Sequence, residues 1–384
     1  MFVDYLQLAD FRSYEAVDVS LGAGVRIFVG ANGQGKTNLV EAIEYLSTLS
    51  SHRVSSDQPL VRSGADRAVV RARVQAGLGD PRQLQLELEI TPGKANRAQL
   101  NRSPLRRARE LVGVLRTVVF APDDLSIVKG DPSERRRFLD ELVVSRWPRL
   151  AAVRADYERA LRQRNTLLKS LGGRVRGPIT SHEVESTLHV WDTHLADAGG
   201  DLLQARLTTL ADLAPHVHKA YAEIAPTNND ATAEYKASID VSGLTSGHGA
   251  ARADLAQAML HTMSNLRSEE IARGLSLVGP HRDDITLTLG MLPARGYASH
   301  GESWSFALAL KLGSFSLLRA DGIEPVLVLD DVFAELDTTR RERLAAAVSA
   351  AEQVLVTAAV SDDVPDILRG RRYSVSGGQV TPDD

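Results

Sequence analysis

The 384-residue chain contains no cysteine, and this absence excludes several kinds of site. Without thiols there is no disulfide framework, no cysteine-ligated zinc or iron–sulfur centre and no cysteine nucleophile. Long apolar runs are missing too, since no stretch approaches the ~18 uncharged apolar residues of a membrane-spanning helix. At the N-terminus Asp4 stands where a signal peptide would have a basic segment. We therefore expect a cytoplasmic protein with no membrane contact.

A strong charge of one sign is also lacking. The formal net charge is −4 and the pI about 6.2, which argues against a histone-like protein held to DNA by bulk charge. The charge is uneven, however: residues 321–384 carry 13 acids and 6 bases, so the other 320 residues sum to +3. Lysine is scarce, at 7 of the 45 basic residues. Codon bias of a GC-rich genome explains this better than a function does.

The length exceeds what one hydrophobic core usually serves, so we expect two lobes. Residues 84–90 alternate apolar and polar side chains, as in a half-buried antiparallel strand. Residues 325–331 and 353–359 are apolar on both faces, as in buried parallel strands, with a helix over 338–351 between them. These patterns predict an α/β head made of residues 1–130 plus 276–384, interrupted by a mostly helical lobe, 131–275.

The predicted helical lobe contains a short a/d seam from Val184 to Leu202. The seam lasts under three heptads and includes Gly199-Gly200, which weakens a helix. We therefore predict a compact helical bundle rather than a long coiled coil. Residues 225–250 are small and polar, which predicts loops around one short strand.

A phosphate-binding loop is predicted at residues 30–37, GANGQGKT, which match G-x-x-x-x-G-K-[ST]. A strand-like segment enters the loop and an amphipathic helix leaves it, which disfavours the alternative of a glycine-rich turn that only caps a helix. Its backbone N–H groups and the helix dipole would surround phosphate oxygens, Lys36 would reach the β- and γ-phosphates, and Thr37 would bind Mg²⁺. The predicted nucleotide-binding residues are Gly30, Ala31, Asn32, Gly33, Gln34, Gly35, Lys36 and Thr37.

Two adjacent carboxylates follow the apolar run at 326–329. A strand end would place Asp330 beside the phosphate loop as a second Mg²⁺ ligand. Asp331 would face the γ-phosphate and orient or deprotonate the attacking water, so Lys36 and Asp331 are the predicted catalytic residues. An aspartate pair that starts a turn is the simpler alternative, but the phosphate loop favours the metal site.

The spacing of these motifs indicates the type of ATPase. Nearly 300 residues separate them, as in heads of the ATP-binding-cassette type found in chromosome and repair ATPases. Such heads carry a Ser-x-Gly-Gln-like signature that contacts the ATP of a partner subunit, and Ser299-His300-Gly301-Glu302 lies in that place. Ser299 would hydrogen-bond the γ-phosphate across a dimer. The alternative is an ordinary helix N-cap.

Taken together, the motifs resemble the RecF family of bacterial recombination and replication-repair ATPases over the whole chain. The resemblance is carried by residues 30–37, SHR at 51–53, 118–140, GPHRDD at 279–284, the signature and LVLDDVFAELD at 327–337. It implies a P-loop ATPase head of the ABC/SMC type, with ATP and Mg²⁺ as cofactors and a slow, DNA-dependent ATPase that acts as a switch. It also implies an ATP-dependent homodimer that binds double-stranded and gapped DNA.

The implied pathway is recombinational repair, replication restart and the SOS response, in which the protein helps RecR and RecO to load RecA. Departures from the family pattern concern Glu302, where glutamine is expected, and Thr357, which stands at the switch-histidine position. Asp123 and Asp124 occupy the region of the glutamine loop, and Asp337 matches the loop that communicates across the dimer. The missing histidine argues against a transporter subunit, and the motif separation argues against a small-molecule kinase. A Rad50- or SMC-like DNA clamp and a scaffold in which ATP is structural stay open.

Two basic clusters are candidates for DNA contact. The first could neutralise several phosphates, although a solvated surface explains it equally well. The second, Arg135 to Arg137, could instead pair with Asp131, Glu134 and Asp140. No aromatic residue interleaves with either cluster, which favours duplex backbone contact over stacking on single strands. The first cluster consists of Lys94, Arg97, Arg102, Arg106, Arg107 and Arg109.

Overall fold

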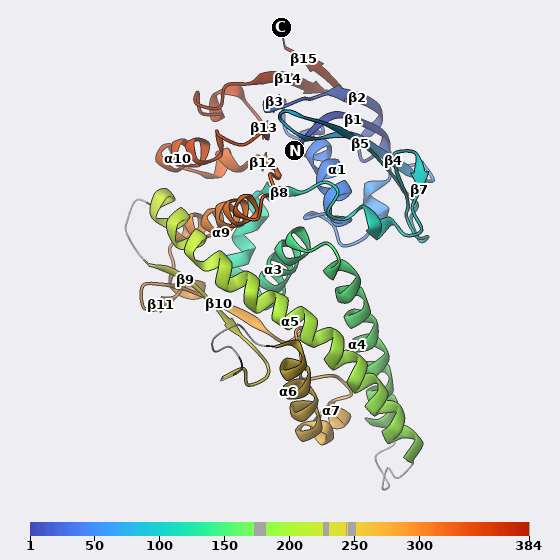
Figure 1. Cartoon of the computed structure of the whole chain (residues 1–384). Helices are drawn as coiled ribbons and strands as arrows, with labels where there is room; N and C mark the ends of the chain where they lie inside the picture. Colours follow the sequence, from blue (N-terminus) through green and yellow to red (C-terminus); the bar gives the residue numbers. More distant parts are fainter. Residues whose placement is uncertain (173–181, 226–229, 243, 245–250, 384) are drawn as a thin grey trace. The chain divides into compact units, whose positions relative to one another are not determined.

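The structure is a computed structural model, and it describes the whole chain except residues 173–181, 226–229, 243, 245–250 and 384 (Figure 1). The described residues form two compact units. The first comprises 1–129, 215–231 and 289–384, and the second comprises 130–214 and 232–288. Within the described residues, no helix is long and apolar enough to cross a membrane.

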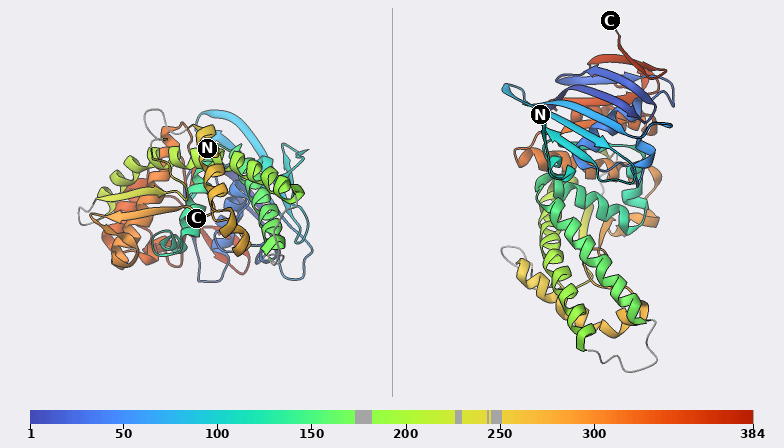
Figure 2. Two further views of the ribbon diagram at one scale, coloured as in Figure 1. Left: turned by 90° about the horizontal axis from the view of Figure 1, so that it is seen from below. Right: turned by 90° about the vertical axis from the view of Figure 1, so that its right-hand side faces the viewer.

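An antiparallel sheet of six strands forms one layer of the first unit, in the order β2-β1-β4-β5-β6-β7. The alternation predicted at 84–90 is confirmed, because Leu86, Leu88 and Ile90 of β5 are buried. Figure 2 shows this sheet from a second side. Its strands are β1 (Phe2–Phe11), β2 (Tyr14–Ser20), β4 (Ala68–Gly77), β5 (Asp80–Ile90), β6 (Arg97–Leu100) and β7 (Ser103–Pro104).

The second sheet of this unit has the order β15-β14-β3-β13-β12-β8. Its strands are parallel except β15, which pairs antiparallel with β14. Every residue of β12 and β13 is buried, as the sequence predicted for strands covered on both faces. The strands are β3 (Gly24–Val29), β8 (Thr117–Phe120), β12 (Val326–Asp330), β13 (Gln353–Ala358), β14 (Arg371–Ser376) and β15 (Gln379–Pro382).

Helix α1 (Lys36–Thr48) packs against strands of both sheets, and its buried side chains join theirs in one hydrophobic core. On the parallel sheet, α9 (His300–Ala320) contacts β8, and α10 (Thr338–Val348) contacts α9. The predicted strand–helix–strand crossover is therefore formed by β12, α10 and β13. Shorter elements of the unit are α2 (Leu125–Lys129), α8 (Ala294–Tyr297), β11 (Leu292–Pro293), and the 3₁₀ turns η1 (Gln58–Leu60), η2 (Ala108–Leu111), η3 (Pro122–Asp124), η4 (Val332–Glu335) and η5 (Ser361–Asp363).

The second unit is mostly helical and has its own core, which includes Tyr157, Leu195, Met259 and Val278. Strands β9 and β10 are its only strands within the described residues, and β9 is the short strand predicted inside 225–250. Its elements are α3 (Pro132–Arg146), α4 (Leu150–Gly172), α5 (His182–Ile224), α6 (Arg252–Asn265), α7 (Arg267–Arg273), β9 (Ala231–Lys236) and β10 (Asp284–Leu289).

Helix α5 differs from the sequence prediction, because it continues through Gly199-Gly200 for 43 residues. A Cβ atom at Gly199 would lie 2.5 Å from the Met259 side chain, and one at Gly200 would lie 2.8 Å from the carbonyl oxygen of Arg252. The two glycines therefore allow α6 to approach α5 closely, and this packing outweighs their low helix propensity. The side chain of Val184, which began the predicted seam, lies outside the described residues.

The domain boundaries given in the sequence analysis stay a prediction. In the structure, residues 215–231 group with the first unit and 276–288 with the second. The boundary at residue 215 falls inside α5, at Pro215.

Candidate nucleotide-binding site

The phosphate loop lies between β3 and α1, at the carboxyl end of the parallel sheet. Gly30 is required by close approach, because a Cβ atom there would lie 2.2 Å from the carbonyl oxygen of Val375. Gly33 and Gly35 have φ values of +80° and +107°, which side chains rarely adopt. The backbone thus takes a shape that a loop without these glycines would not hold.

Lys36 is the first residue of α1 and is 3% exposed. Its ammonium group donates hydrogen bonds to the carbonyl oxygens of Gly30 at 2.8 Å and Ala31 at 3.4 Å. The charge therefore points back over the loop. Together with the helix N-terminus it makes this concavity favourable for an anion.

Tertiary structure brings Thr37 and Asp330 together across 293 residues of sequence. The Thr37 hydroxyl donates to Oδ1 of Asp330 at 3.0 Å. Asp330 ends β12 and is 4% exposed. Burial raises its pKa, the charge of Asp331 adds to this rise, and the hydroxyls of Thr357 and Thr37 oppose it. The Thr37 hydroxyl and the buried Asp330 carboxylate at this distance supply the hard oxygen ligands that Mg²⁺ prefers.

Asp331 follows with φ +48° and ψ +17°, a left-handed conformation in which it starts η4. Its side chain lines a pocket of about 370 Å³ together with Asn32, Lys36, Thr37 and Arg53. The two predicted catalytic residues, Lys36 and Asp331, therefore line the same pocket. A carboxylate in this place can accept a proton from, or orient, a water molecule beside a bound phosphate.

Three residues of the site were not predicted to act there. Arg53 lines the pocket and donates to Asn38 at 2.9 Å and to Glu41 at 3.0 Å. His52 lies between two carboxylates, with Nδ1 2.5 Å from Glu44 and Nε2 3.8 Å from Asp330.

Burial favours the neutral ring of His52, but the hydrogen bond and charge of Glu44 outweigh it, so the pKa of His52 is raised. The motif SHR at 51–53 was the only sequence signal for His52 and Arg53. Thr357, the third residue, contacts both aspartates of the acidic strand end.

The signature residues form the start of α9. Ser299 is the N-cap, its hydroxyl accepts from the backbone N–H of Glu302 at 3.3 Å, and the Glu302 carboxylate accepts from the Ser299 N–H at 2.8 Å. Hydrogen bonds from Ser299 hold the pKa of Glu302 below its usual range. Glu302 therefore completes a capping box, a role that glutamine could also fill. The N-cap interpretation is confirmed, and an exposed Ser299 stays available for contact with another chain.

The loop that contains Asp337 is held by arginines. Asp337 caps α10 by accepting from the Arg340 N–H at 2.9 Å, and Arg340 also donates to Ser305 of α9 at 2.9 Å. Asp124 has a structural role, since it accepts from the Ala121 N–H at 2.9 Å and pairs with Lys311 at 2.8 Å.

The motif GPHRDD at 279–284, which had no physical explanation in the sequence, binds the second unit together. Gly279 has φ +121°, and a Cβ atom there would lie 2.5 Å from the Tyr157 hydroxyl. That hydroxyl shares a hydrogen bond of 2.7 Å with Nδ1 of His281. Burial lowers the pKa of His281 to about 4.

The two aspartates of this motif are also internal. Asp283 is 1% exposed and accepts from the Tyr235 hydroxyl and the Ser238 N–H, both at 2.7 Å. Asp284 accepts two hydrogen bonds from Arg135, at 2.7 and 3.0 Å. The basic cluster at 135–137 is thus largely committed to pairing inside the unit: Arg135 pairs with Asp284, and Arg137 pairs at 3.2 Å with Glu134, one of the predicted acids.

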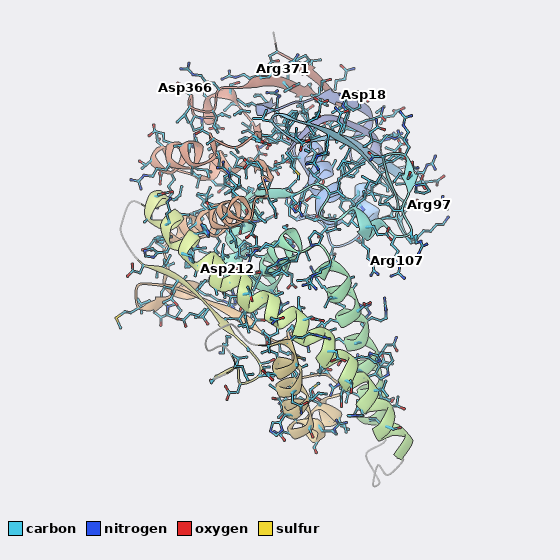
Figure 3. All side chains as sticks on the ribbon, viewed as in Figure 1. Asp18, Arg97, Arg107, Asp212, Asp366 and Arg371 are labelled. Atoms are coloured by element: carbon cyan, nitrogen blue, oxygen red, sulfur yellow. The ribbon has the colours of Figure 1, made fainter. Side chains whose placement is uncertain are left out.

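The first basic cluster lies on and beside the β5–β6–β7 end of the antiparallel sheet, where Arg97 and Arg107 project outward (Figure 3). Lys94, Arg97, Arg102, Arg106 and Arg107 are exposed, and Arg109 is half-buried. Arg97 is 3.9 Å from Glu89, and Arg102 donates to Gln85 at 3.3 Å. Lys94, Arg106, Arg107 and Arg109 have no acidic partner among the described residues.

The chain is similar to known proteins over nearly its whole length. The family model described as the RecF/RecN/SMC N-terminal domain matches residues 2–367. The DNA replication and repair protein RecF of Cutibacterium acnes is 61% identical, covering 99% of this chain and 98% of the relative. RecF of Streptomyces avermitilis is 58% identical, with 99% of each chain covered.

Solved structures show the same similarity. The recombination mediator protein RecF of the RecFOR pathway, described with ATPrS, matches with a TM-score of 0.87 and 26% identity over 100% of this chain and 98% of that one. An Smc head bound to the C-winged helix domain of ScpA matches with a TM-score of 0.55 and 16% identity over 100% and 97% of the chains, which shows the fold alone. The α/β head of the ABC/SMC type predicted from the sequence is therefore confirmed.

Proposed function

Because the chain belongs to the RecF family, we propose that it is an ATP-binding and ATP-hydrolysing protein of DNA replication and repair. The observation that carries this proposal is the contact between Thr37 and Asp330. It joins a complete phosphate loop to the acidic end of a buried parallel strand, which is the arrangement that P-loop ATPases use for a nucleotide and its metal. The RecF relative described with ATPrS supports ATP as the ligand.

In this proposal the loop N–H groups of residues 30–37 and the Lys36 ammonium bind the β- and γ-phosphates. Thr37 and Asp330 hold Mg²⁺, which neutralises phosphate charge when it is bound. Asp331 orients the attacking water and accepts its proton. Lys36 and Asp331 are thus the catalytic residues. Hydrolysis is slow and DNA-dependent, and it serves as a switch.

Nucleotide binding further leads to a homodimer in which Ser299 contacts the ATP of the partner. The exposed N-terminus of α9 supports this, since its backbone N–H groups and the Ser299 hydroxyl can meet a phosphate. The capping box with Glu302 orders this helix start before any partner arrives.

The dimer binds double-stranded and gapped DNA through the cluster of Lys94, Arg97, Arg102, Arg106, Arg107 and Arg109. Arg106 and Arg107 support phosphate contact, because both are exposed and neither has an acidic partner among the described residues. A monomer offers few such contacts, and two copies joined by ATP double them. In the cytoplasm the protein would act with RecR and RecO to load RecA, in recombinational repair, replication restart and the SOS response.

The decisive experiment compares wild type with Lys36→Ala. We expect Lys36→Ala to abolish ATP binding and ATP-dependent dimerisation, measured by calorimetry and sedimentation, and to remove the ATP-dependent gain in binding to duplex and gapped DNA. Lys219→Ala is the matched control, because Lys219 is an exposed lysine of α5. A Lys36→Ala protein that still forms a dimer with ATP would contradict the scheme.

Asp331→Asn tests whether hydrolysis matters. An ATPase switch requires normal ATP binding, blocked hydrolysis and a persistent dimer in this variant. Unchanged repair in cells that carry Asp331→Asn would instead indicate a scaffold in which ATP is structural.

A further inference from the structure

Thr357 is the residue of β13 that lies directly opposite Asp330 in the parallel register. It is 1% exposed. Its hydroxyl donates to Oδ1 of Asp330 at 2.6 Å and accepts from the backbone N–H of Asp331 at 2.9 Å. One side chain thus holds the carboxylate of the first aspartate and the backbone of the second.

The backbone at Asp331 needs such support. A residue other than glycine with φ near +50° is destabilised by about 1–2 kcal/mol relative to ordinary conformations. The turn between the two aspartates therefore persists only where neighbouring groups hold it. The Thr357 hydroxyl is the group that satisfies the Asp331 N–H.

The carboxylate of Asp330 is held from two sides. Oδ1 accepts one hydrogen bond from Thr37 of α1 and one from Thr357 of β13. Thr37 is itself a proposed metal ligand. Thr357 is not, so its hydroxyl can hold the Asp330 carboxylate while Thr37 binds the metal. Valine has the shape of threonine but makes neither hydrogen bond.

We propose that Thr357 is a positioning residue that sets the Asp330 carboxylate and the Asp331 turn for metal-assisted ATP hydrolysis. This inference rests on the proposed function of the site. Thr357 acts through the two aspartates and touches no nucleotide itself. Loss of its hydroxyl should therefore reduce the gain in ATP affinity that Mg²⁺ gives and should slow hydrolysis. It should leave metal-free nucleotide binding intact.

The test compares Thr357→Val with Thr357→Ser. ATP affinity is measured by calorimetry in EDTA and over a Mg²⁺ series, and kcat is measured at saturating ATP and Mg²⁺. We expect Thr357→Val to keep its affinity in EDTA, to lose roughly tenfold of the gain from Mg²⁺ and to lower kcat by about tenfold or more, the size of a hydrogen bond to a charged group. Thr357→Ser keeps the hydroxyl and should restore both.

The matched control is Thr117→Val, which removes another buried hydroxyl from the same sheet. Thr117 lies on β8 and donates to Ser47 at 3.1 Å, away from both aspartates. It should behave as wild type in all three measurements.

Three outcomes would overturn the inference. Thr357→Val could keep the full Mg²⁺ gain and kcat, Thr357→Ser could fail as Thr357→Val does, or Thr357→Val could also lose ATP affinity in EDTA. If the wild-type protein binds and hydrolyses ATP, any of these results refutes the positioning role of Thr357 and leaves the proposed function standing. A wild-type protein that binds no ATP would instead refute the proposed function, and this inference with it.

Discussion

Arg206 of α5 is expected to be the most sensitive charged residue of the second unit. It is 3% exposed, and its guanidinium donates to both oxygens of Asp140 at 2.7 and 2.9 Å. It also donates to the carbonyl oxygen of Pro280 at 2.6 Å and to the Tyr235 hydroxyl at 3.2 Å. Four hydrogen bonds thus connect α5, α3, β9 and the GPHRDD motif.

Arg206→Met keeps the apolar stem and removes the charge. Asp140 is 6% exposed, and its next cation, Arg154, lies 3.8 Å away. Breaking a buried ion pair from one side typically costs about 3–5 kcal/mol, because the remaining charge stays buried without compensation. We expect Arg206→Met to lower the free energy of unfolding of the second unit by that amount. Adding Asp140→Leu removes the stranded charge, so the double variant should recover a large part of the loss.

Urea unfolding followed by tryptophan fluorescence suits this test. Trp147 and Trp191 belong to the second unit and Trp304 to the first, so two of the three tryptophans report on the unit that carries the change. Arg159→Met is the control, because Arg159 pairs with Asp156 at 3.1 Å on an exposed face and should contribute under about 1 kcal/mol. A loss below about 1 kcal/mol for Arg206→Met, or a double variant less stable than Arg206→Met, would refute the reasoning.

Two further predictions concern pH and DNA. The pKa of His281 falls from 6.5 in the unfolded chain to about 4 in the folded protein. The free energy of unfolding should therefore be highest above pH 6.5 and should fall by up to about 3 kcal/mol as the pH is lowered to 4. In urea unfolding from pH 7 to 4.5, His281→Asn should show a shallower slope, and parallel slopes would contradict this. Changing Arg106 and Arg107 to alanine should weaken duplex binding and reduce the slope of log K against log salt by roughly two for each protomer of the dimer, since each phosphate contact contributes about 0.9. Arg371 and Arg372 changed to alanine are the charge-matched control, and a slope unchanged by the first pair would place the DNA surface elsewhere.

The phosphate loop and the strands around it could be predicted because their signals are local. Gly33, Gly35, Lys36 and Thr37 act through the backbone and side chains of one eight-residue segment. Likewise, β12 and β13 are buried along their whole length, so their apolar runs are unambiguous. Short-range chemistry of this kind needs no knowledge of the partner strand.

The course of α5 could not be predicted in the same way. Gly199-Gly200 weakens an isolated helix, and only the approach of Met259 and the Arg252 carbonyl shows why glycine is needed there. The GPHRDD motif was visible in the sequence, but its role depends on Tyr157 and Arg206, which lie 124 and 74 residues away from their partners in it.

By itself, the amino-acid sequence determined the nucleotide loop, the acidic strand end and the α/β class, because each depends on residue types at fixed short spacing. Only the tertiary structure decided which other residues reach this site: Thr357, which contacts both aspartates, and His52, which lies beside Asp330. The physical reason is that a hydrogen bond between residues far apart in the chain requires the packing of several elements. No local pattern encodes that packing, and the positions that it selects are ordinary threonines and histidines until the sheet forms.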